Sequence, residues 1–519
     1  MGMANTPAGD SPERRPRRRA LPSIGLDQLW ALLALALIGV FIALVPTPPH
    51  DFWWHLKAGQ LVATSGIPST NLFAWSVPAE RPFVYATWLA EWLFYALYAA
   101  GGPQAPVLAR NLLGLAGFAL VALEARRRSG SWRLAALAAL LAWLMAINNL
   151  PARTQNWAWA PFALFALILG AYAAGQARPR ALLALPVLMA FWVNAHGSFA
   201  LGLGMLAIVL AGETLRMLLR RPGAPSLERL RWLYLAAAAT LAATLINPSG
   251  AGIFGYVSKL LADPSIQGLV VEWQPPTPRG IAGTAFFGSI LALLAAFALA
   301  RRRPTITDLG LACAFLWLAW GSQRNVIWYG MVAMPLLAQS LAPPQPAPAR
   351  TRRGGQTSLP SALIALALLA ALVAVQPPLK ARLGLPEPYQ SLFADVPGAP
   401  GLYAADTPVA ATEYLRAHPA EGRLFNEMGY GSYLDWALYP AAQVFVDPRI
   451  ELYPPEIWQD YLAIRDARDY NALLIDKYDV RRVLLDRLSQ PRLAAALAAD
   501  PRWRREYADS RAEIYRRTP

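Results

Sequence analysis

A carboxylate, two imidazoles and two indoles lie together in the heptapeptide HDFWWHL, residues 50–56. The apolar segment before it, residues 26–45, is long enough to cross a bilayer as a helix, so we expect Asp51 at a membrane surface. A carboxylate is costly there unless it is solvated, paired or used. Asp51 could accept a proton from a hydroxyl group, hold a metal ion, or cap the helix that follows. His55 would share its helical face, and the two indoles would anchor the membrane interface.

Two arginines stand where later apolar segments end. Arg153 lies in NNLPARTQN and Arg324 in GSQRN, both expected on the same side of the membrane as Asp51. An arginine at the outer edge of a helical bundle either pairs with a carboxylate or binds a phosphate through its two parallel N–H groups. Glu91 and Glu272 are the carboxylates that could form such pairs. Both alternatives stay open.

A third polar group lies in WVNAHGSF, at the junction of two apolar segments. Gly197 permits a tight turn that would direct Asn194 and His196 into the same outer region. A histidine that bonds to the backbone at the end of a helix fits the same sequence.

Metal binding has the weakest support in the sequence. Asp51, His55, His196 and Glu272 could together bind a hard cation or zinc, but their spacing matches no metal-binding motif. No GxSxG, Walker A, HExxH or CxxC pattern occurs, and the single Cys313 leaves no disulfide framework or cysteine metal site. We therefore expect no certain cofactor, and a divalent cation stays an unsupported alternative.

The composition is that of a membrane protein, because 56% of the residues are hydrophobic and 15% are charged. Basic residues concentrate in the loops between alternate apolar segments, which predicts that these loops and the N-terminus are cytoplasmic. About eleven crossings satisfy this alternation if residues 88–100 form a re-entrant or surface helix, and about thirteen satisfy it equally well. The net charge of +15 then reflects topology and does not indicate nucleic-acid binding.

Three regions follow from this pattern. We expect residues 1–25 to form a disordered basic cytoplasmic tail, residues 26–376 a polytopic α-helical membrane module, and residues 377–519 an extracytoplasmic α/β domain. Long outer loops are expected at residues 46–87 and 247–281. In the last region the patterns predict strands at 422–426, 443–446, 482–486 and 513–517, and helices at 407–417, 431–438, 455–467, 470–477 and 491–498.

The sequence VFVDPRIELYP places Asp447 and Arg449 directly after one of these predicted strands. Loops that follow strands in α/β domains often bind ligands, so both residues are candidates for a site in the soluble domain. A buried Asp–Arg pair that holds the loop fits the sequence as well.

The chain resembles the GT-C superfamily, the polytopic glycosyltransferases that use polyprenyl-phosphate-linked sugars, and within it a group of bacterial membrane proteins. The residues that carry the resemblance to that group are DFWWHLKAGQLVATSGIPSTNLFAW, TWLAEWLFY, PARTQ, WVNAHGSFALG, INPSG, VEW and VFVDPRIELY, which together span most of the chain. In GT-C enzymes a catalytic or metal-binding Asp or Glu lies in the first outer loop directly after the first span, and Asp51 occupies that place. One departure is that Phe52 and Trp53 follow Asp51, so no DxD motif is present. This departure favours a metal-independent general base.

The resemblance implies an inverting glycosyltransferase at the outer face of the bacterial cytoplasmic membrane. It would move a sugar from a polyprenyl-phosphate donor to a hydroxyl group of a glycan, lipid or protein. Asp51 would be the catalytic base, and Arg153 and Arg324 would bind the donor phosphate. The residues expected to orient the substrates are His55, Glu91, Asn194, His196 and Glu272. A transporter or flippase of a lipid-linked solute and a non-catalytic membrane scaffold are the alternatives.

Overall fold

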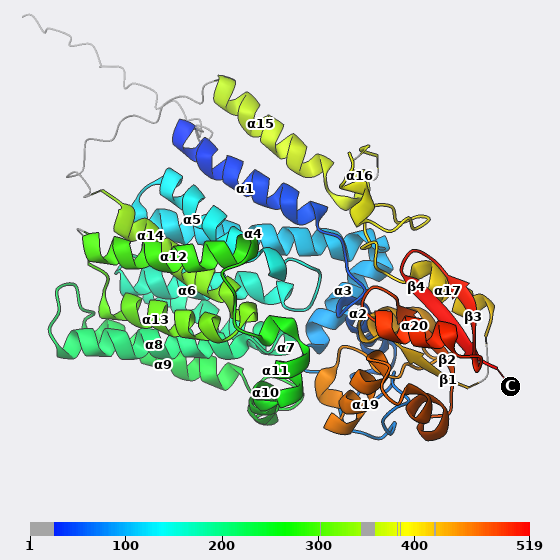
Figure 1. Cartoon of the computed structure of the whole chain (residues 1–519). Helices are drawn as coiled ribbons and strands as arrows, with labels where there is room; N and C mark the ends of the chain where they lie inside the picture. Colours follow the sequence, from blue (N-terminus) through cyan, green and yellow to red (C-terminus); the bar gives the residue numbers. More distant parts are fainter. Residues whose placement is uncertain are drawn as a thin grey trace, which may run out of the picture.

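The computed structural model describes residues 25–300, 303–343, 359–380, 382–384, 386–419 and 422–518 of the 519-residue chain. It contains a bundle of helices with an α/β domain at one end (Figure 1). Short helices of the outer loops lie between the two (Figure 1). The basic tail predicted for residues 1–25 falls outside the described residues apart from its last residue.

Apolar helices build the bundle. They are α1 (Leu26–Leu44), α4 (Gln104–Ser129), α5 (Trp132–Met145), α6 (Asn156–Ala173), α7 (Ala184–Ala195), α8 (Phe199–Leu218), α9 (Leu227–Ala243), α12 (Gly280–Leu299), α13 (Ile306–Gly321), α14 (Val326–Leu341) and α15 (Leu359–Ala374). Among the described helices, 5 are long and apolar enough to cross a membrane, namely α1, α4, α6, α8 and α12. The other bundle helices are shorter, so the number of about eleven to thirteen crossings stays a prediction.

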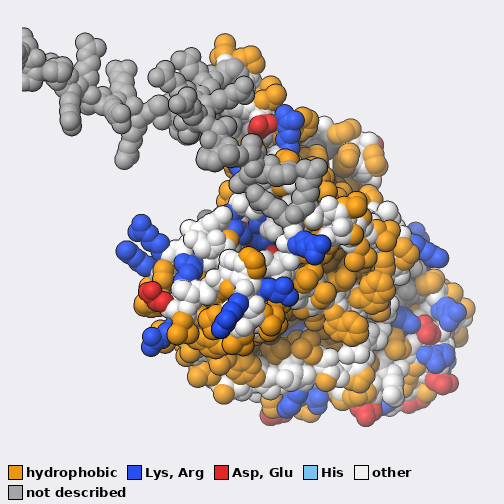
Figure 2. Space-filling model, turned by 90° about the vertical axis from the view of Figure 1, so that its left-hand side faces the viewer, with side chains coloured by type: hydrophobic (Ala, Val, Ile, Leu, Met, Phe, Trp, Pro, Cys, Tyr) orange, Lys and Arg blue, Asp and Glu red, His pale blue; other side chains and the backbone are white. Residues whose placement is uncertain are grey.

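The two ends of the bundle differ in charge. Arginine-rich loops join α6 to α7 and α8 to α9, and arginines flank the junction of α4 and α5, at the end that faces away from the α/β domain. Figure 2 looks onto this end, where Lys and Arg side chains gather among apolar ones. The loops that carry Asp51, Arg153, His196 and Arg324 lie at the opposite end, next to the α/β domain.

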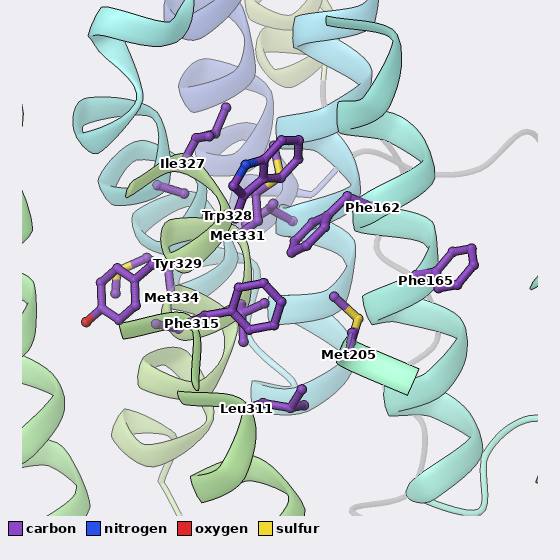
Figure 3. Packing of buried hydrophobic residues seen from close by; sticks show 14 of the residues in the cluster. Phe162, Phe165, Met205, Leu311, Phe315, Ile327, Trp328, Tyr329, Met331 and Met334 are labelled. Atoms are coloured by element: carbon purple, nitrogen blue, oxygen red, sulfur yellow. The ribbon is translucent and has the colours of Figure 1, made fainter. Parts of the chain in front are cut away.

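Aromatic and methionine side chains fill the middle of the bundle (Figure 3). The ring of Phe162 on α6 lies edge-on to Phe315 of α13 and tilted against Trp328 of α14, with centroids 5.4 and 4.8 Å apart. Such aromatic pairs stabilise by about 0.5–1.5 kcal/mol beyond the area they bury. Gly117 of α4 lets α6 approach closely, because a Cβ there would lie 3.2 Å from Cβ of Trp159.

A four-stranded sheet with the strand order β1-β2-β4-β3 forms the centre of the α/β domain. The pair β1–β2 is parallel, whereas β4 is antiparallel to both β2 and β3. The elements are α16 (Pro377–Lys380), α17 (Val409–Ala417), β1 (Arg423–Asn426), α18 (Met428–Leu438), α19 (Pro455–Arg465), β2 (Val480–Asp486), α20 (Pro491–Ala499), β3 (Trp503–Ala508) and β4 (Ala512–Arg517). The predicted fold class, a helical membrane protein with a C-terminal α/β domain, is confirmed.

Two details of the predicted strands are wrong. The segment 443–446 is not a strand of the sheet, because Val444 forms an isolated bridge to Ala74 of the first outer loop instead. Strand β3 was not predicted, because its outward-facing Arg504 and Arg505 leave only a short apolar signal.

The first outer loop contributes to the core of the α/β domain. It contains α2 (Phe52–Ser65), and in the segment after this helix the buried Phe73 packs into the same cluster as Phe445. Trp53 and Trp54 are buried beneath the domain and do not lie at a lipid interface as the sequence suggested. The ring of Trp53 lies edge-on to Tyr403, with centroids 4.8 Å apart. Packing against the C-terminal domain therefore fixes the position of α2, the helix that Asp51 directly precedes.

The remaining outer helices are short. The segment predicted as a re-entrant or surface helix is α3 (Trp88–Gly101), which packs against α2, α4 and α7. The second outer loop contains α10 (Gly252–Ala262) and α11 (Pro264–Leu269).

Candidate functional site

Asp51 stands between α1 and α2 in a backbone conformation that L-residues rarely adopt, with φ 42° and ψ −62°. It directly precedes α2, but its side chain does not cap that helix. With the described residues, the half-buried carboxylate forms no hydrogen bond and no ion pair. A backbone held in such a region costs about 1–3 kcal/mol, and residues of this kind cluster at functional sites. Capping, one of the roles open from the sequence, is therefore not what this side chain does.

Two buried basic side chains fix the end of α1 just before Asp51. Lys380 Nζ donates a hydrogen bond to the carbonyl of Ala43 at 3.0 Å, and Arg110 Nη2 donates to that of Val45 at 2.9 Å. Carbonyl groups at the C-terminal end of a helix lack intrahelical donors and attract positive charge. The two side chains therefore anchor the turn from which the Asp51 segment starts.

Arg153 and Glu272 form an ion pair, with Nη1 2.6 Å from Oε2. The backbone N–H of Arg153 donates to the side chain of Asn156 at the start of α6, which fixes the loop that carries the arginine. Glu272 lies in the 3₁₀ turn η3 (Val271–Trp273), and Ser322 donates to its carbonyl at 3.0 Å. The structure thus contains one of the arginine–carboxylate pairs that the sequence left open.

The guanidinium of Arg153 is only partly satisfied by this pair. Arg153 is 6% exposed, and its Nε and Nη2 are buried without a hydrogen-bond partner. A buried donor without a partner costs about 1–3 kcal/mol, which a bound acceptor group would recover. Arg153 can therefore stay paired with Glu272 and still offer N–H groups to an anion.

Arg324 approaches the same region from the 3₁₀ turn η4 (Gln323–Asn325). Its Nη2 lies 3.3 Å from Nε2 of His196, and its guanidinium lies over the ring of Trp273 at 5.4 Å. Nδ1 of His196 accepts a hydrogen bond from the N–H of Ser198 at 3.1 Å. The junction of α7 and α8 therefore turns His196 towards Arg324.

The arginines and carboxylates of this site lie close enough to shift the pKa values of one another and of His196. Burial lowers the pKa of Arg324, and the charge of Arg153 lowers it further, while Glu272 and Asp51 act in the opposite direction. Burial would also lower the pKa of Arg153, but the ion pair with Glu272 outweighs it and the net shift is upward. Burial alone would raise the pKa of Glu272, but the ion pair with Arg153 outweighs burial and the net shift of the pKa is downward. Burial lowers the pKa of His196 well below its usual value, and both arginines add to this, so the imidazole is neutral.

His55 and Glu91 form a second pair, between α2 and α3. Nδ1 of His55 lies 2.8 Å from Oε1 of Glu91, and Thr87 donates to the same oxygen at 2.7 Å. Glu91 is fully buried, and its other oxygen has no partner. If Nδ1 of His55 carries the proton and donates it to Glu91, Nε2 is the nitrogen of the neutral ring that can accept a hydrogen bond. The pair thereby fixes the orientation of His55.

Asn194 uses its whole side-chain amide to join three elements. Its Oδ1 accepts from Trp88 Nε1 at 2.8 Å, and its Nδ2 donates to the carbonyls of Ala190 and Ile246 at 2.8 and 2.6 Å. These bonds tie the start of α3 to α7 and to the loop after α9.

Asp447 and Arg449 form a fully buried ion pair in the α/β domain, with Nη2 2.6 Å from Oδ2. The guanidinium also lies over the ring of Phe73 at 4.7 Å and within 3.4 Å of the Tyr85 hydroxyl. This geometry matches the alternative in which the pair holds the loop, and it joins the loop to the first outer loop.

Glu451 of the α/β domain also reaches the site, and the sequence analysis did not select it. Its Oε1 accepts a hydrogen bond from the hydroxyl of Tyr256 on α10 at 3.1 Å, and its charge acts on Arg324. Glu451 belongs to the sequence VFVDPRIELYP noted above, but nothing in that sequence shows that its side chain meets α10, so only the tertiary structure could reveal this contact.

A second contact from the α/β domain lies beside Asp51. A Cβ on Gly429 would lie 2.7 Å from Nδ1 of His50 and 3.0 Å from Oε2 of Glu427. His50 therefore lies against the first turn of α18, where a larger residue than glycine would displace the side chain of His50 or Glu427.

The side chains present do not fit a metal site. Across the described ranges, no group of three or more His, Cys, Asp and Glu side chains lies close enough together to hold a metal ion. Asp51 instead shares its surroundings with the two arginines.

The fold has solved counterparts. The structure is similar to the oligosaccharyltransferase of Archaeoglobus fulgidus tethered with an acceptor peptide, with a TM-score of 0.51 and 12% identity over 95% of this chain and 74% of that chain. It is also similar to the arabinofuranosyltransferase AftD from Mycobacteria, with a TM-score of 0.54 and 18% identity over 96% of this chain and 42% of that chain. The chain has a GT-C-like fold.

The GT-C-like fold is evident from structure and not from a sequence match. No protein-family model matches the chain, and no curated protein matches it. This chain spans less than half of the length of AftD.

Proposed function

We propose that the chain is an inverting glycosyltransferase that uses a polyprenyl-phosphate-linked sugar at the outer face of the bacterial cytoplasmic membrane. The observation that carries the proposal is the buried guanidinium of Arg153, which retains two nitrogens without partners in the same site as the strained Asp51. Free arginine donors beside a carboxylate that has no partner suit a phosphate leaving group and an acceptor hydroxyl. The GT-C-like fold supports the same assignment.

The donor phosphate would bind to Arg153 and Arg324. Negative charge grows on the phosphate as the sugar departs, and fixed donors in a site that excludes water stabilise this charge. Glu272 holds Arg153 in place through one nitrogen only, so the other N–H groups remain for the phosphate. The neutral His196 would direct Arg324 without adding charge.

Asp51 would accept the proton of the acceptor hydroxyl while the hydroxyl oxygen bonds to the anomeric carbon. The bond between that carbon and the phosphate oxygen breaks, and its electron pair leaves with the polyprenyl phosphate. Attack from the face opposite the phosphate inverts the anomeric configuration. The substrate-orienting groups in this proposal are His55, Glu91, Asn194, His196 and Glu272.

The proposed orientation has the α/β domain outside the cytoplasm. It is supported by the arginine-rich loops at the other end of the bundle, which the positive-inside rule assigns to the cytoplasm (Figure 2). The donor would then enter from the bilayer, and an acceptor glycan, lipid or protein would enter from the α/β-domain side, past Glu427 and Glu451.

The test is transfer by the full chain in vesicles supplied with polyprenyl-phosphate sugars extracted from bacterial membranes. Asp51→Asn removes the base without changing side-chain size, and we expect transfer to fall by about 100-fold or more. Asp263→Asn is the matched control, because Asp263 caps α11 in an outer loop and belongs to no part of the site. Full activity of Asp51→Asn would overturn the proposal. Movement of intact lipid-linked solute without transfer would support a transporter instead, and neither transfer nor movement would support a scaffold.

A further inference from the structure

A cavity of about 370 Å³ opens at the arginine-rich end of the bundle, the end opposite Asp51. It lies between the last turns of α4, α6, α8 and α14 and the first turns of α13. Small-molecule sites in proteins typically measure about 300–1,000 Å³, so the cavity is large enough for a ligand. The proposed transfer reaction makes no use of it.

The rim of the cavity is a network of arginines and carboxylates. Glu124 of α4 accepts hydrogen bonds from Arg127 and Arg128, and Arg128 also donates to Asp308 of α13 at 2.9 Å. On α8, Glu213 is paired with Arg216 at 2.8 Å. Residues from three helices therefore fix the positions of the rim charges.

The rim offers hydrogen-bond donors to a ligand, because its carboxylate oxygens already have partners. Both oxygens of Glu124 and of Asp308 accept hydrogen bonds from other side chains or from the backbone. Glu213 is satisfied in the same way by Arg216 and Thr307. Nη2 of Arg128 donates no hydrogen bond to any residue that the structure describes. A ligand at the rim would therefore be an acceptor.

Glycine residues permit the close packing of this rim. A Cβ on Gly170 of α6 would lie 2.6 Å from Oε1 of Glu124 and 3.2 Å from Nη2 of Arg128. A Cβ on Gly212 of α8 would lie 2.5 Å from the hydroxyl of Thr307. The polar side chains thus lie directly against the helix backbones, which leaves the centre of the cavity open.

The floor of the cavity is apolar. Figure 3 shows Met205, Leu311 and Met331, which line this floor, in the core of the bundle. The lining residues of α14 extend from Met331 to Gln339, a rise of about 12 Å along the helix. A cavity that is polar at its mouth and apolar at its floor suits an amphiphile whose headgroup lies at the membrane surface.

We infer that this cavity binds the anionic phosphate headgroup of a lipid. Nη2 of Arg128 would contact the phosphate, the charge of Arg127 would attract it from beside, and the apolar floor would hold part of a lipid chain. Clusters of basic residues surround the mouth and attract anionic lipids, and basic pockets between helices on the cytoplasmic side bind phosphate headgroups in other membrane proteins. A bulk anionic phospholipid and a polyprenyl phosphate share this chemistry, and the experiment distinguishes them.

The test is native mass spectrometry of the full chain in detergent, titrated separately with phosphatidylglycerol, a polyprenyl phosphate and phosphatidylcholine. Arg127→Gln removes one rim charge while Arg128 still pairs with Glu124, and we expect about fivefold weaker binding of the phosphate lipid. Ala173→Phe fills the cavity, and we expect about tenfold weaker binding or more. The lipid whose binding falls in both variants is the occupant.

The matched controls are Arg133→Gln, an exposed arginine at the same end of the bundle, and Leu137→Phe, an exposed residue of α5. Both should bind like the parent chain. Loss of polyprenyl-phosphate binding in Arg153→Lys but not in Ala173→Phe would assign that lipid to the outer site only and leave the cavity to phosphatidylglycerol. Parental binding of all three lipids by Ala173→Phe, or equally tight phosphatidylcholine binding, would overturn the inference. If Ala173→Phe does not fold, the comparison of Arg127→Gln with Arg133→Gln decides.

Discussion

Arg153 donates one hydrogen bond to Glu272 over 2.6 Å and keeps two other guanidinium nitrogens buried without partners. An ion pair that served stability alone would leave no donor of the arginine without a partner, because each buried N–H group that lacks one destabilises the fold by about 1–3 kcal/mol. The Asp447–Arg449 pair is the contrast within the same chain, since it is fully buried and Nε, Nη1 and Nη2 of its arginine all have partners. The partial satisfaction of Arg153 is therefore the feature that points to a ligand.

We predict that Arg153→Lys weakens the binding of polyprenyl phosphate by about tenfold or more while the fold is retained. A lysine can keep the ion pair with Glu272, but it lacks the planar fork that contacts a phosphate through two parallel bonds. The measurement is native mass spectrometry of the purified chain titrated with a polyprenyl phosphate.

Arg133→Lys serves as the control for that comparison, because Arg133 forms an exposed ion pair with Asp27 outside the site. Equal affinity of the parent, Arg153→Lys and Arg133→Lys would mean that Arg153 does not contact the phosphate. A Glu272→Gln variant that binds the lipid normally would limit Glu272 to holding Arg153.

Asp51→Gly should raise stability while it removes transfer. Glycine accepts a positive φ without strain, so relief of the Asp51 backbone should outweigh the added chain entropy and stabilise the protein by about 1 kcal/mol. The thermal midpoint of the variant in detergent would rise, and transfer would be lost together with the carboxylate. A midpoint lower than that of the parent would show that the Asp51 side chain stabilises the fold and that its conformation is not strained.

Much of the fold could be predicted from the sequence because hydrophobic periodicity reports burial directly. Helices such as 491–499 and strands such as 482–486 are found close to their predicted bounds. The segment 443–446 was misassigned because its apolar alternation reflects burial against the first outer loop, a contact between distant parts of the chain. Burial of Trp53 under the α/β domain was missed for the same reason.

Part of the candidate site could be predicted from the sequence. Residues at the ends of apolar segments share one face of a membrane bundle, and this argument selected Arg153, Glu272, His196 and Arg324, which the structure brings together. Which carboxylate pairs with which arginine depends on tertiary contacts that the sequence does not show. The same holds for Glu451, because that residue reaches the site only through the docking of the α/β domain.

Glu91→Gln should leave the fold intact and lower the rate of transfer. The amide can still accept a hydrogen bond from Thr87, but it no longer carries the charge that favours a proton on Nδ1 of His55. If His55 orients a substrate through Nε2, the maximal rate falls while the affinity for polyprenyl phosphate does not change. His55→Gln should then lower the rate to a similar extent, and the double variant should be no slower than either single one. Additive losses would mean that the two residues act independently.

Lys380 gives a pH dependence of stability that can be checked without any substrate. Burial lowers its pKa from 10.5 to about 7, and the charge of Arg110 contributes to the same shift. Between these values the unfolded chain binds the proton and the folded chain does not, so stability should rise as the pH increases from about 7 towards 10 and be constant below that range.

Lys380→Met should remove this slope and raise the thermal midpoint at pH 7, whereas Lys259→Met, at an exposed position of α10, should keep the slope of the parent. Thermal midpoints in detergent at pH 7, 8 and 9 measure the effect. A slope that persists in Lys380→Met would mean that Lys380 remains charged in the fold, and its bond to the end of α1 would then be a charge-assisted one.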